Sequence, residues 1–278
     1  EMIIPFVHCE KMLPGCWQGA AQERGDCVSH STKNAAMMTM ICDILSGLPD
    51  KTSGKVEGLP EIDPAGIKEG ALSTEAIYWM RGYNGDGWSC DTAAHVAMTS
   101  AGLWLRNNYP DLGIDLRNYS GSLAGKYGSR KPPQEILDYG KGHLVHDATD
   151  VDGPAELATL LKNGQGITTC GGEGFSSSRD DNGFSRRQGG WSHAFAAIGY
   201  DGRDVVKQRY NTQALICFMN SWAEGNSGGR RSMGTSSDIP GGAGWARWED
   251  VKNRQIIAFA GAVGWVAKTL PPINLVVG

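Results

Sequence analysis

The chain has 278 residues, and its 26 basic and 30 acidic side chains give a formal net charge of −4 at pH 7. This near balance excludes a strongly basic nucleic-acid binder and a highly acidic disordered tail as leading classes. Hydrophobic residues make up 40% of the chain, which excludes wholesale disorder, and the longest apolar run, Ile256 to Ala267, is too short to span a membrane. We therefore expect a folded protein with neither nucleic-acid nor membrane partners.

Helical signals dominate the chain up to about residue 165. The first 24 residues have no clear period and are expected to form an extended lead-in. From Gly25 onward, apolar residues recur at three- and four-residue spacing until Gly47 and Pro49. Residues 46–72 are rich in Gly, Pro, Lys and Asp, which indicates a surface excursion. Further helices are predicted at Thr74–Arg81, Thr92–Asn107, Glu135–Tyr139 and Asp152–Asn163.

Short apolar runs separated by glycine-rich turns follow, and they are typical of antiparallel strands. The predicted strands are Gly166–Cys170, Ala194–Tyr200, Ala214–Met219, Trp245–Trp248 and Ile256–Val266. Helices followed by strands predict an α+β protein with a helical lobe and a β lobe. We expect one domain over residues 1–278, with the lead-in at 1–24, a mainly helical lobe at 25–130 and a mainly β lobe at 131–278.

Two Gly- and Ser-rich loops are expected at 171–190 and 223–244, and each contains an Arg pair, Arg186-Arg187 or Arg230-Arg231. Such a pair can hold an anion, and a solvated loop face is the alternative. The seven cysteines are odd in number and scattered, which does not indicate the disulfide framework of a secreted protein. His8 and Cys9 with Cys16 would make half a metal site, but nothing nearby completes it. We therefore expect neither a metal nor a cofactor.

Cys27 is the first candidate for chemistry, because it stands where the first predicted helix begins. A thiol at a helix N-terminus lies at the positive end of the helix dipole, which lowers its pKa toward a reactive thiolate. Gly25, two residues earlier, leaves space for another backbone, such as a substrate, to approach. The alternative for Cys27 is an inert buried cysteine, which is our interpretation of Cys42 in the same helix.

His193 is the histidine best placed to serve a nucleophilic cysteine as its base. It follows a glycine-rich turn and Ser192, and it opens a predicted strand. Asn220 ends the next predicted strand, and adjacent antiparallel strands would bring its amide beside His193 to fix the tautomer and direction of the imidazole. Trp222 would then cover this hydrogen bond from water.

Three segments resemble the signature blocks of papain-like cysteine peptidases in the family's Cys, His, Asn order: Gly25-Asp26-Cys27, Ser192–Tyr200 and Asn220-Ser221-Trp222. The resemblance spans nearly the whole chain, because other segments are similar to the family's supporting pieces: Asn84–Gly87, Gly153–Gly164 with the strand after it, and Gly244–Trp248. It implies a papain-like two-lobe fold, with Cys27 on a helix of one lobe and His193 and Asn220 on the sheet of the other. The block Gly-Asp-Cys-Val-Ser is similar to papain-like proteins of bacteria and bacteriophages.

The chain departs from the family's pattern around its oxyanion glutamine. That residue stands six positions before the cysteine in the family, where this chain has Ala21. Gln22 would need a one-residue deletion and Gln18 a three-residue insertion, so we prefer Gln22 and keep Gln18 as the alternative. The spacing from Cys27 to His193, 193 − 27 = 166 residues, also exceeds the family's roughly 130–150.

The resemblance implies a cysteine peptidase that cleaves a peptide or protein substrate through an acyl-enzyme on Cys27. His193 would be the base, Asn220 would orient it, and Gln22 would help to hold the oxyanion. The alternatives are a related amidase or isopeptidase, and a structural protein, for example of a virion, that keeps the fold with weak or no catalysis. The family's usual disulfide cysteines have no clear counterparts, so we expect a reducing cytoplasm or a virion, with virion or assembly proteins as further partners, rather than secretion.

Overall fold

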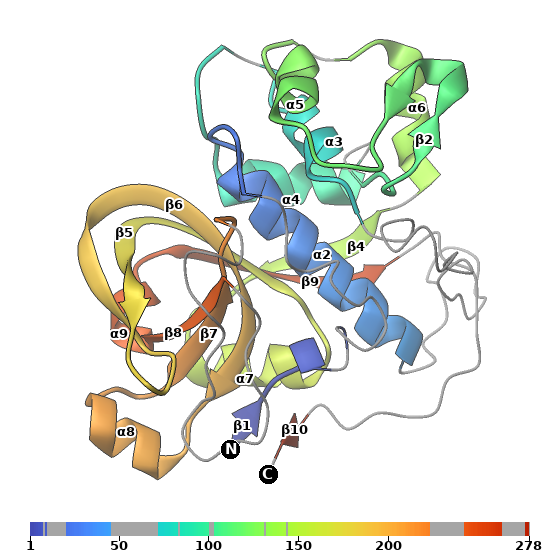
Figure 1. Ribbon diagram of the computed structural model, residues 1–278. Helices are drawn as coiled ribbons and strands as arrows, with labels where there is room; N and C mark the ends of the chain where they lie inside the picture. The colour runs from blue at the N-terminus through green and yellow to red at the C-terminus, as the bar shows by residue number, and fades with distance from the viewer. Residues whose placement is uncertain are drawn as a thin grey trace.

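The computed structural model describes residues 1–7, 9, 21–45, 72–82, 84–99, 103–130, 132–142, 144–222, 242–262 and 276–277. Within these ranges it combines helices with antiparallel strands, as the predicted α+β class requires (Figure 1). The helices are α2 (Cys27–Leu45), α3 (Thr74–Trp79), α4 (Cys90–Thr99), α5 (Gly121–Gly128), α6 (Gln134–Tyr139), α7 (Pro154–Lys162), α8 (Asp204–Tyr210) and α9 (Trp248–Val251). The strands are β1 (Met2–Ile3), β2 (Asn108–Tyr109), β3 (Ile114–Asp115), β4 (Val145–Asp150), β5 (Ile167–Arg179), β6 (Ser185–Asp201), β7 (Leu215–Met219), β8 (Ala243–Arg247), β9 (Gln255–Ala262) and β10 (Val276–Val277).

Eight strands of the described residues form one antiparallel sheet. Its order is β10-β1-β6-β5-β9-β4, and β7 and β8 continue from β6. β5 and β6 form a long ribbon that curls away from the rest of the sheet (Figure 1). The predicted loop at 171–190 is therefore wrong, because most of it is strand with irregular register. Its glycines made the sequence look like a loop, yet Gly174 is needed for packing, since a Cβ there would lie 1.7 Å from Trp191 Nε1.

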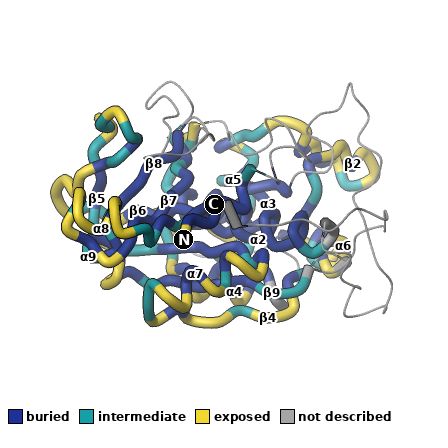
Figure 2. Tube along the Cα trace, turned by 90° about the horizontal axis from the view of Figure 1, so that it is seen from below, coloured by how far each residue is buried: buried dark blue, intermediate teal, exposed yellow. Residues whose placement is uncertain are grey.

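Helix α2 is the central helix, and it packs against β5, β6 and β9 on one side and against α3 and α4 on the other. Figure 2 shows it buried, and two of its polar side chains bond to strands of the sheet. Ser31 and Thr168 of β5 share a hydrogen bond of 2.6 Å, and the Thr39 hydroxyl donates to the Phe259 carbonyl of β9. This packing fixes the N-terminal end of α2 against the sheet.

A second, smaller apolar core lies among α3, α6 and the β2–β3 hairpin. It is rich in aromatic side chains that meet edge to face, as Trp79 and Trp104 do with ring centroids 5.9 Å apart. Its buried members are Ala76, Trp79, Trp104, Tyr109, Ile114, Leu116 and Ile136. The larger core holds the apolar residues of α2 and of the sheet. The predicted division of the chain at residue 130 stays a prediction.

Several predicted elements change in the structure. Helix α4 ends at Thr99 rather than Asn107, and residues 103–107 are not helical. The side chains of neighbouring Leu103 and Trp104 enter different cores. Several elements were not predicted, among them β4, which is mostly polar, the short α8, and α5, which is glycine-rich. The short elements β1, β2, β3, α9 and β10 were not predicted either. The glycines of α5 allow close packing, since a Cβ on Gly128 would lie 2.6 Å from the Tyr78 ring.

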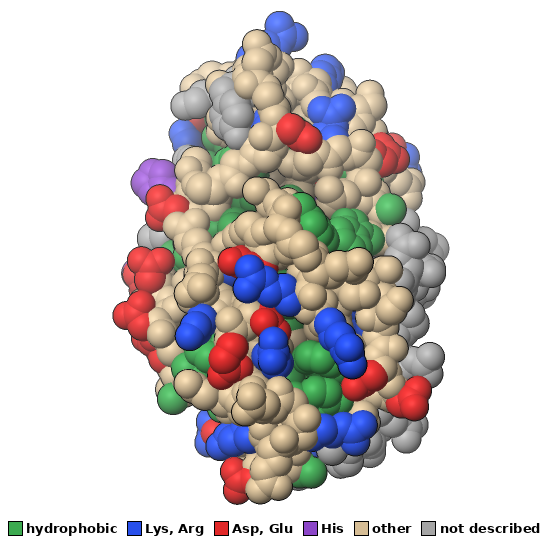
Figure 3. Space-filling view, turned by 90° about the vertical axis from the view of Figure 1, so that its left-hand side faces the viewer, with side chains coloured by type: hydrophobic (Ala, Val, Ile, Leu, Met, Phe, Trp, Pro, Cys, Tyr) green, Lys and Arg blue, Asp and Glu red, His purple; other side chains and the backbone are tan. Residues whose placement is uncertain are grey.

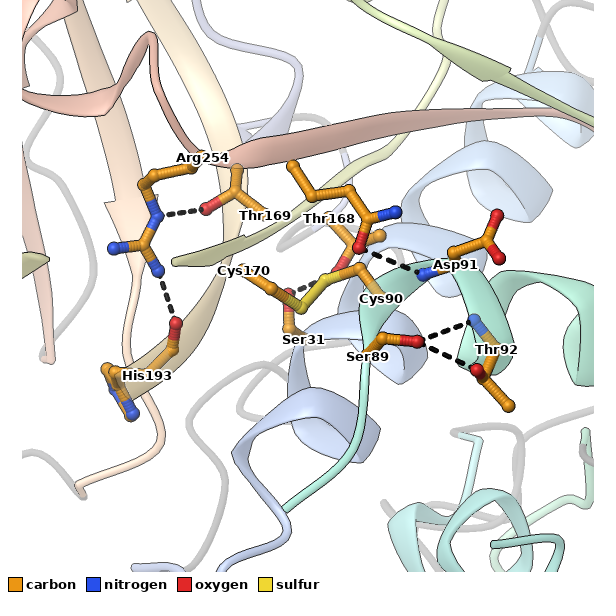
Figure 4. The surroundings of a disulfide bond; sticks show 11 residues. Ser31, Ser89, Cys90, Asp91, Thr92, Thr168, Thr169, Cys170, His193 and Arg254 are labelled. Atoms are coloured by element: carbon orange, nitrogen blue, oxygen red, sulfur yellow. Dashed lines mark hydrogen bonds between the residues drawn. A yellow bond between two sulfur atoms is a disulfide. The ribbon is translucent and has the colours of Figure 1, made fainter. Parts of the chain in front are cut away.

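A disulfide between Cys90 and Cys170 joins the first residue of α4 to β5 (Figure 4). The sequence analysis did not predict this bond, because the two cysteines are 80 residues apart and belong to no recognised spacing. Cys27, Cys42 and Cys217 are free thiols, and Cys9 Sγ lies 4.0 Å from Cys42 Sγ. The half metal site proposed around Cys9 lies mostly outside the described residues, which contain no cluster of three metal-ligating side chains.

The face that carries the β5–β6 ribbon mixes basic and acidic side chains (Figure 3). Arg186 and Arg187 are exposed on β6, whereas Arg230 and Arg231 lie outside the described residues. Ion pairs such as Arg203–Asp201 tie part of the basic charge to neighbouring carboxylates. No helix in the described part of the chain is long and apolar enough to cross a membrane.

Candidate active site

A cleft of about 1060 Å³ lies where the N-terminus of α2 meets the β5–β6 ribbon. Six of the seven predicted site residues line it: Gln22, Gly25, Cys27, Ser192, His193 and Trp222. The seventh, Asn220, is hydrogen-bonded to His193. Much of the remaining lining comes from the loop before α4 and from the start of β5: Asp86, Gly87, Trp88, Ser89, Cys170, Gly171 and Gly172. The structure thus gathers residues that are far apart in the sequence.

Cys27 is the first residue of α2, and its side chain is 9% exposed at the wall of the cleft. Burial raises the pKa of its thiol, and backbone hydrogen bonds at Ala194 and Val28 oppose that rise. The charges of Asp26 and Asp86 raise this pKa further. The sequence predicted the opposite direction from the helix dipole alone, and the prediction is wrong because desolvation is the larger effect.

His193 and Asn220 meet because β6 and β7 are adjacent antiparallel strands, with Ala196 paired to Met219. His193 Nε2 lies 2.7 Å from Asn220 Oδ1. Asn220 Oδ1 also accepts a hydrogen bond from the Ser221 backbone N–H, which confirms this atom as the acceptor. The neutral imidazole therefore carries its hydrogen on Nε2, and Nδ1 keeps a free lone pair.

Burial lowers the pKa of His193 to about 4, although the Asn220 hydrogen bond raises it and the charge of Arg254 lowers it further. Burial thus acts on His193 and Cys27 in the same sense, because it favours the neutral form of each. Near pH 7 the resting site holds a thiol and a neutral imidazole. A base in this state can accept a proton from a thiol as that thiol reacts.

Trp222 stacks on the His193 imidazole, with centroids 4.8 Å apart and planes 23° apart. Trp191 in turn stacks on Trp222, with ring centroids 5.0 Å apart. The sequence analysis named Trp222 as a cover for His193 but did not single out Trp191. The sequence signal for Trp191 was its position two residues before His193, because residues i and i+2 of a strand point to the same face.

Gln22 lies in the cleft with Cys27, and its backbone N–H donates to the Ser221 carbonyl at 2.8 Å. Its side-chain oxygen accepts a hydrogen bond from the Ser221 hydroxyl, and its amide nitrogen donates to the Arg24 carbonyl at 3.1 Å. These bonds fix the amide and leave one amide hydrogen for another acceptor. Gln18, the alternative, lies outside the described residues.

Gly25 is required for a reason that the sequence analysis did not foresee. A Cβ there would lie 2.1 Å from the Asp86 carboxylate, so the space beside Gly25 is taken by a side chain of the loop before α4. Asp86 belongs to the segment Asn84–Gly87 and lines the cleft. An acidic group thus stands near Cys27, where the sequence pattern alone gave only a glycine-rich turn.

Asp26, the residue before Cys27, is fully buried at the base of the site. The Tyr119 hydroxyl donates to Asp26 Oδ2 at 2.7 Å, and His30 Nε2 lies 3.7 Å from Asp26 Oδ1. Burial raises the pKa of Asp26 from 3.8 to about 7, and the Tyr119 hydrogen bond opposes that rise. Burial also holds the pKa of His30 well below its usual range.

Asp26→Asn is expected to be more stable than the parent at pH 8, by up to about 4 kcal/mol, and nearly equal to it at pH 4. The folded chain keeps the Asp26 proton up to a pKa of about 7, whereas the unfolded chain releases it near 3.8. Stability from this group is therefore complete below pH 4 and is lost as the pH rises through 7, at about 1.36 kcal/mol per pH unit. Urea unfolding at pH 4, 6 and 8 measures the difference.

The matched control for this prediction is Asp181→Asn, at an exposed carboxyl in the turn between β5 and β6. It should follow the parent at every pH. Parallel stability curves for Asp26→Asn and the parent between pH 4 and 8 would contradict the prediction.

No family model matches the sequence, and a search of curated proteins finds no relative. Among solved structures the chain is similar to xylellain, a cysteine protease from Xylella fastidiosa, with a TM-score of 0.54 and 13% identity over 94% of this chain and 85% of that one. It is also similar to the clostridial cysteine protease Cwp84 after propeptide cleavage, with a TM-score of 0.52 and 14% identity over 88% of this chain and 54% of that one. A Clostridium difficile Cwp84 structure with protease and lectin-like domains gives 0.52 and 15% over 88% and 49%. The chain thus spans about half the length of the Cwp84 chains that it matches.

Proposed function

We propose that this chain, which has the fold of the papain-like cysteine proteases, is a peptidase that forms an acyl-enzyme on Cys27. One observation carries the proposal: His193, hydrogen-bonded through Nε2 to Asn220 at 2.7 Å, lines the same cleft as Cys27. This arrangement supplies a thiol, a base with a free Nδ1 lone pair, and a group that fixes the tautomer of the base.

In the first step the Cys27 sulfur attacks the carbonyl carbon of the scissile peptide bond, and the thiol proton passes to His193 Nδ1. The carbonyl oxygen becomes an oxyanion, which the Gln22 amide and the Cys27 backbone N–H stabilise. The C–N bond then breaks, and the imidazolium donates its proton to the leaving amine. Water, deprotonated by His193, attacks the resulting thioester and releases the acid and the free thiol.

Asn220 keeps the Nε2 hydrogen in place throughout this cycle, and Trp222 shields the imidazole by stacking on it. The substrate is a peptide or protein, and Gly25 and Ser192 form part of the wall that it contacts. Disulfides persist in oxidising surroundings. Of the two locations that the sequence favours, a virion therefore fits the Cys90–Cys170 bond better than a reducing cytoplasm does.

The test combines thiol labelling with a cleavage assay. We expect an epoxysuccinyl inhibitor or limiting iodoacetamide to modify Cys27 ahead of Cys9, Cys42 and Cys217, because those three are 0–1% exposed and lie away from the cleft. Peptide mapping by mass spectrometry identifies the labelled residue. Pre-labelling and Cys27→Ala should each abolish cleavage of a fluorogenic peptide library.

Cys217→Ala is the matched control, since it removes a buried thiol of the sheet that does not line the cleft. It should keep both the labelling and the cleavage. A Cys27 that reacts no faster than the buried thiols, in a chain that cleaves no peptide, would favour the structural alternative. Cleavage that survives Cys27→Ala would exclude the thiol mechanism.

A further inference from the structure

Behind His193 lies a fully buried arginine that the proposed reaction does not use. The Arg254 guanidinium is 0% exposed and donates to the His193 backbone carbonyl, to Thr169 Oγ1 at 3.0 Å and to the Glu173 carbonyl at 2.8 Å. Figure 4 shows it reaching from the start of β9 to β5 and to the backbone of His193. It thereby links the start of β9 to β5 and β6 at the site.

The fold makes room for this cation. A Cβ on Gly171, the residue paired with His193 across β5 and β6, would lie 2.6 Å from Arg254 Cγ. On another side, the guanidinium carbon stands 4.3 Å from the centroid of the Phe195 ring. A glycine and an aromatic face thus surround the side chain, so its position is fixed by packing as well as by hydrogen bonds.

The charge of Arg254 is only partly neutralised. Glu173 is the acidic partner, but its Oε2 lies 3.8 Å away, too far for a hydrogen bond. Burial lowers the pKa of Arg254 to about 10, and the charges of Glu173 and Cys27 oppose that fall. At neutral pH the guanidinium remains positive, in surroundings where screening by water is weak. A buried cation without a close counter-ion lowers the free energy of unfolding, so stability by itself does not explain this arginine.

We propose that Arg254 is a positioning residue of this site, which holds the backbone of His193 and whose charge favours the thiolate of Cys27 over the thiol. The inference rests on the proposed function, since it assigns Arg254 a part in the reaction of Cys27. The peptide between His193 and Ala194 links the two groups, because its carbonyl accepts a hydrogen bond from Arg254 and its N–H donates to the Cys27 sulfur. A negative sulfur and the guanidinium therefore stabilise each other. The same charge disfavours the imidazolium and so keeps His193 ready to accept a proton.

The other charges that reach Cys27 act in the opposite direction. Asp26 and Asp86 both raise the pKa of the thiol. At His193 the Asn220 hydrogen bond opposes the effect of Arg254, because it raises the pKa of the imidazole. Arg254 contributes a positive charge that opposes these two carboxylates. Arg24, which lines the cleft, is a second cation and acts on Asp26.

The experiment measures the rate of Cys27 alkylation by iodoacetamide from pH 5 to pH 11, with peptide mapping and without reductant. Arg254→Met should move the midpoint of the profile upward by about one pH unit and slow alkylation about tenfold below that midpoint. Arg254→Lys keeps the charge near neutral pH and loses the forked donors, so it should keep the alkylation rate at pH 7 while lowering kcat. Arg247→Met, which removes an arginine paired with Asp250, should change neither the midpoint nor kcat.

Glu173→Gln provides a test of opposite sign. It removes the carboxylate that faces Arg254 while conserving its shape, so the midpoint should move downward. Should Arg254→Met fail to fold by circular dichroism, the double variant Glu173→Gln/Arg254→Met, which removes both charges, is compared with Glu173→Gln. A purely structural role of Arg254 predicts equal midpoints in these two variants, because the direct effect of the Glu173 charge on Cys27 is absent from both. An unchanged midpoint in folded Arg254→Met, or an unchanged or raised midpoint in Glu173→Gln, would overturn the proposal.

Failure of the proposed function is visible separately. Alkylation reports the charge of the Cys27 sulfur whether or not the chain cleaves peptides. A midpoint that shifts as expected in a chain without cleavage supports the electrostatic role of Arg254 and contradicts the peptidase. A midpoint that does not shift in a chain that cleaves peptides contradicts only the role of Arg254.

Discussion

Replacing His193 with alanine is expected to lower kcat for peptide cleavage by about 10⁴- to 10⁶-fold. Burial keeps the Cys27 thiol protonated at neutral pH, so attack on a carbonyl needs a neighbouring group that accepts the proton. His193 is that group in the proposed mechanism, and its Nδ1 is free because Nε2 is bonded to Asn220. Steady-state kinetics with a fluorogenic peptide, supported by circular dichroism, measure the loss.

Asn220→Ala should lower kcat much less, by about 10- to 100-fold, because it removes one hydrogen bond to a group that becomes charged. The imidazole would keep its place on β6 and its stacking on Trp222. His146→Ala, at an exposed histidine of β4, is the control and should leave kcat unchanged. A loss below tenfold in His193→Ala would contradict the assignment of His193 as the base.

The candidate site could be predicted from the sequence because each member is marked by a local signal. Cys27 follows a glycine at the start of a periodic helix, and the structure begins α2 at that residue. His193 and Asn220 stand at neighbouring ends of two successive strand patterns. Antiparallel pairing of such strands brings their ends together, so the hydrogen bond between the two side chains follows from topology.

The contributions of Arg254 and of the Cys90–Cys170 bond could not be predicted, because they depend on tertiary contacts. Arg254 is adjacent to Gly171 only through the pairing of β5 with β9, and the disulfide joins segments 80 residues apart. The direction of the pKa shift of Cys27 has the same origin. The effect of the helix dipole can be inferred from the position of Cys27 in the sequence, whereas the burial of Cys27 depends on how the sheet covers α2.

Glycine content misled the prediction of secondary structure in two places. The β5–β6 ribbon and helix α5 both contain glycines that local propensity assigns to loops. In the structure several of these glycines stand where another side chain approaches closely, as Trp191 does at Gly174 and Tyr78 does at Gly128. Packing has overridden propensity at these positions.

Removing the disulfide in Cys90→Ala/Cys170→Ala is expected to lower the free energy of unfolding by about 4.5 kcal/mol. The bond closes a loop with a sequence separation of 80 residues, so its loss restores a large conformational entropy to the unfolded chain. Urea denaturation without reductant measures the difference. A matched variant, Cys42→Ala/Cys217→Ala, also removes two buried sulfurs but opens no loop, and it should lose less stability.

The Cys90→Ala/Cys170→Ala variant should weaken substrate binding more than it slows the chemical step. Cys170 lines the cleft, and Trp88 and Ser89, just before Cys90, line the facing wall, so the disulfide fixes the distance between two walls. Cys27 and His193 are held by α2 and β6, which the bond does not join. We therefore expect KM to rise while kcat changes little, and reductant should reproduce the effect in the parent but not in the double variant. A fall in kcat at unchanged KM would show instead that the disulfide acts on the reacting groups through β5, where Cys170 is paired with Ala194 beside His193.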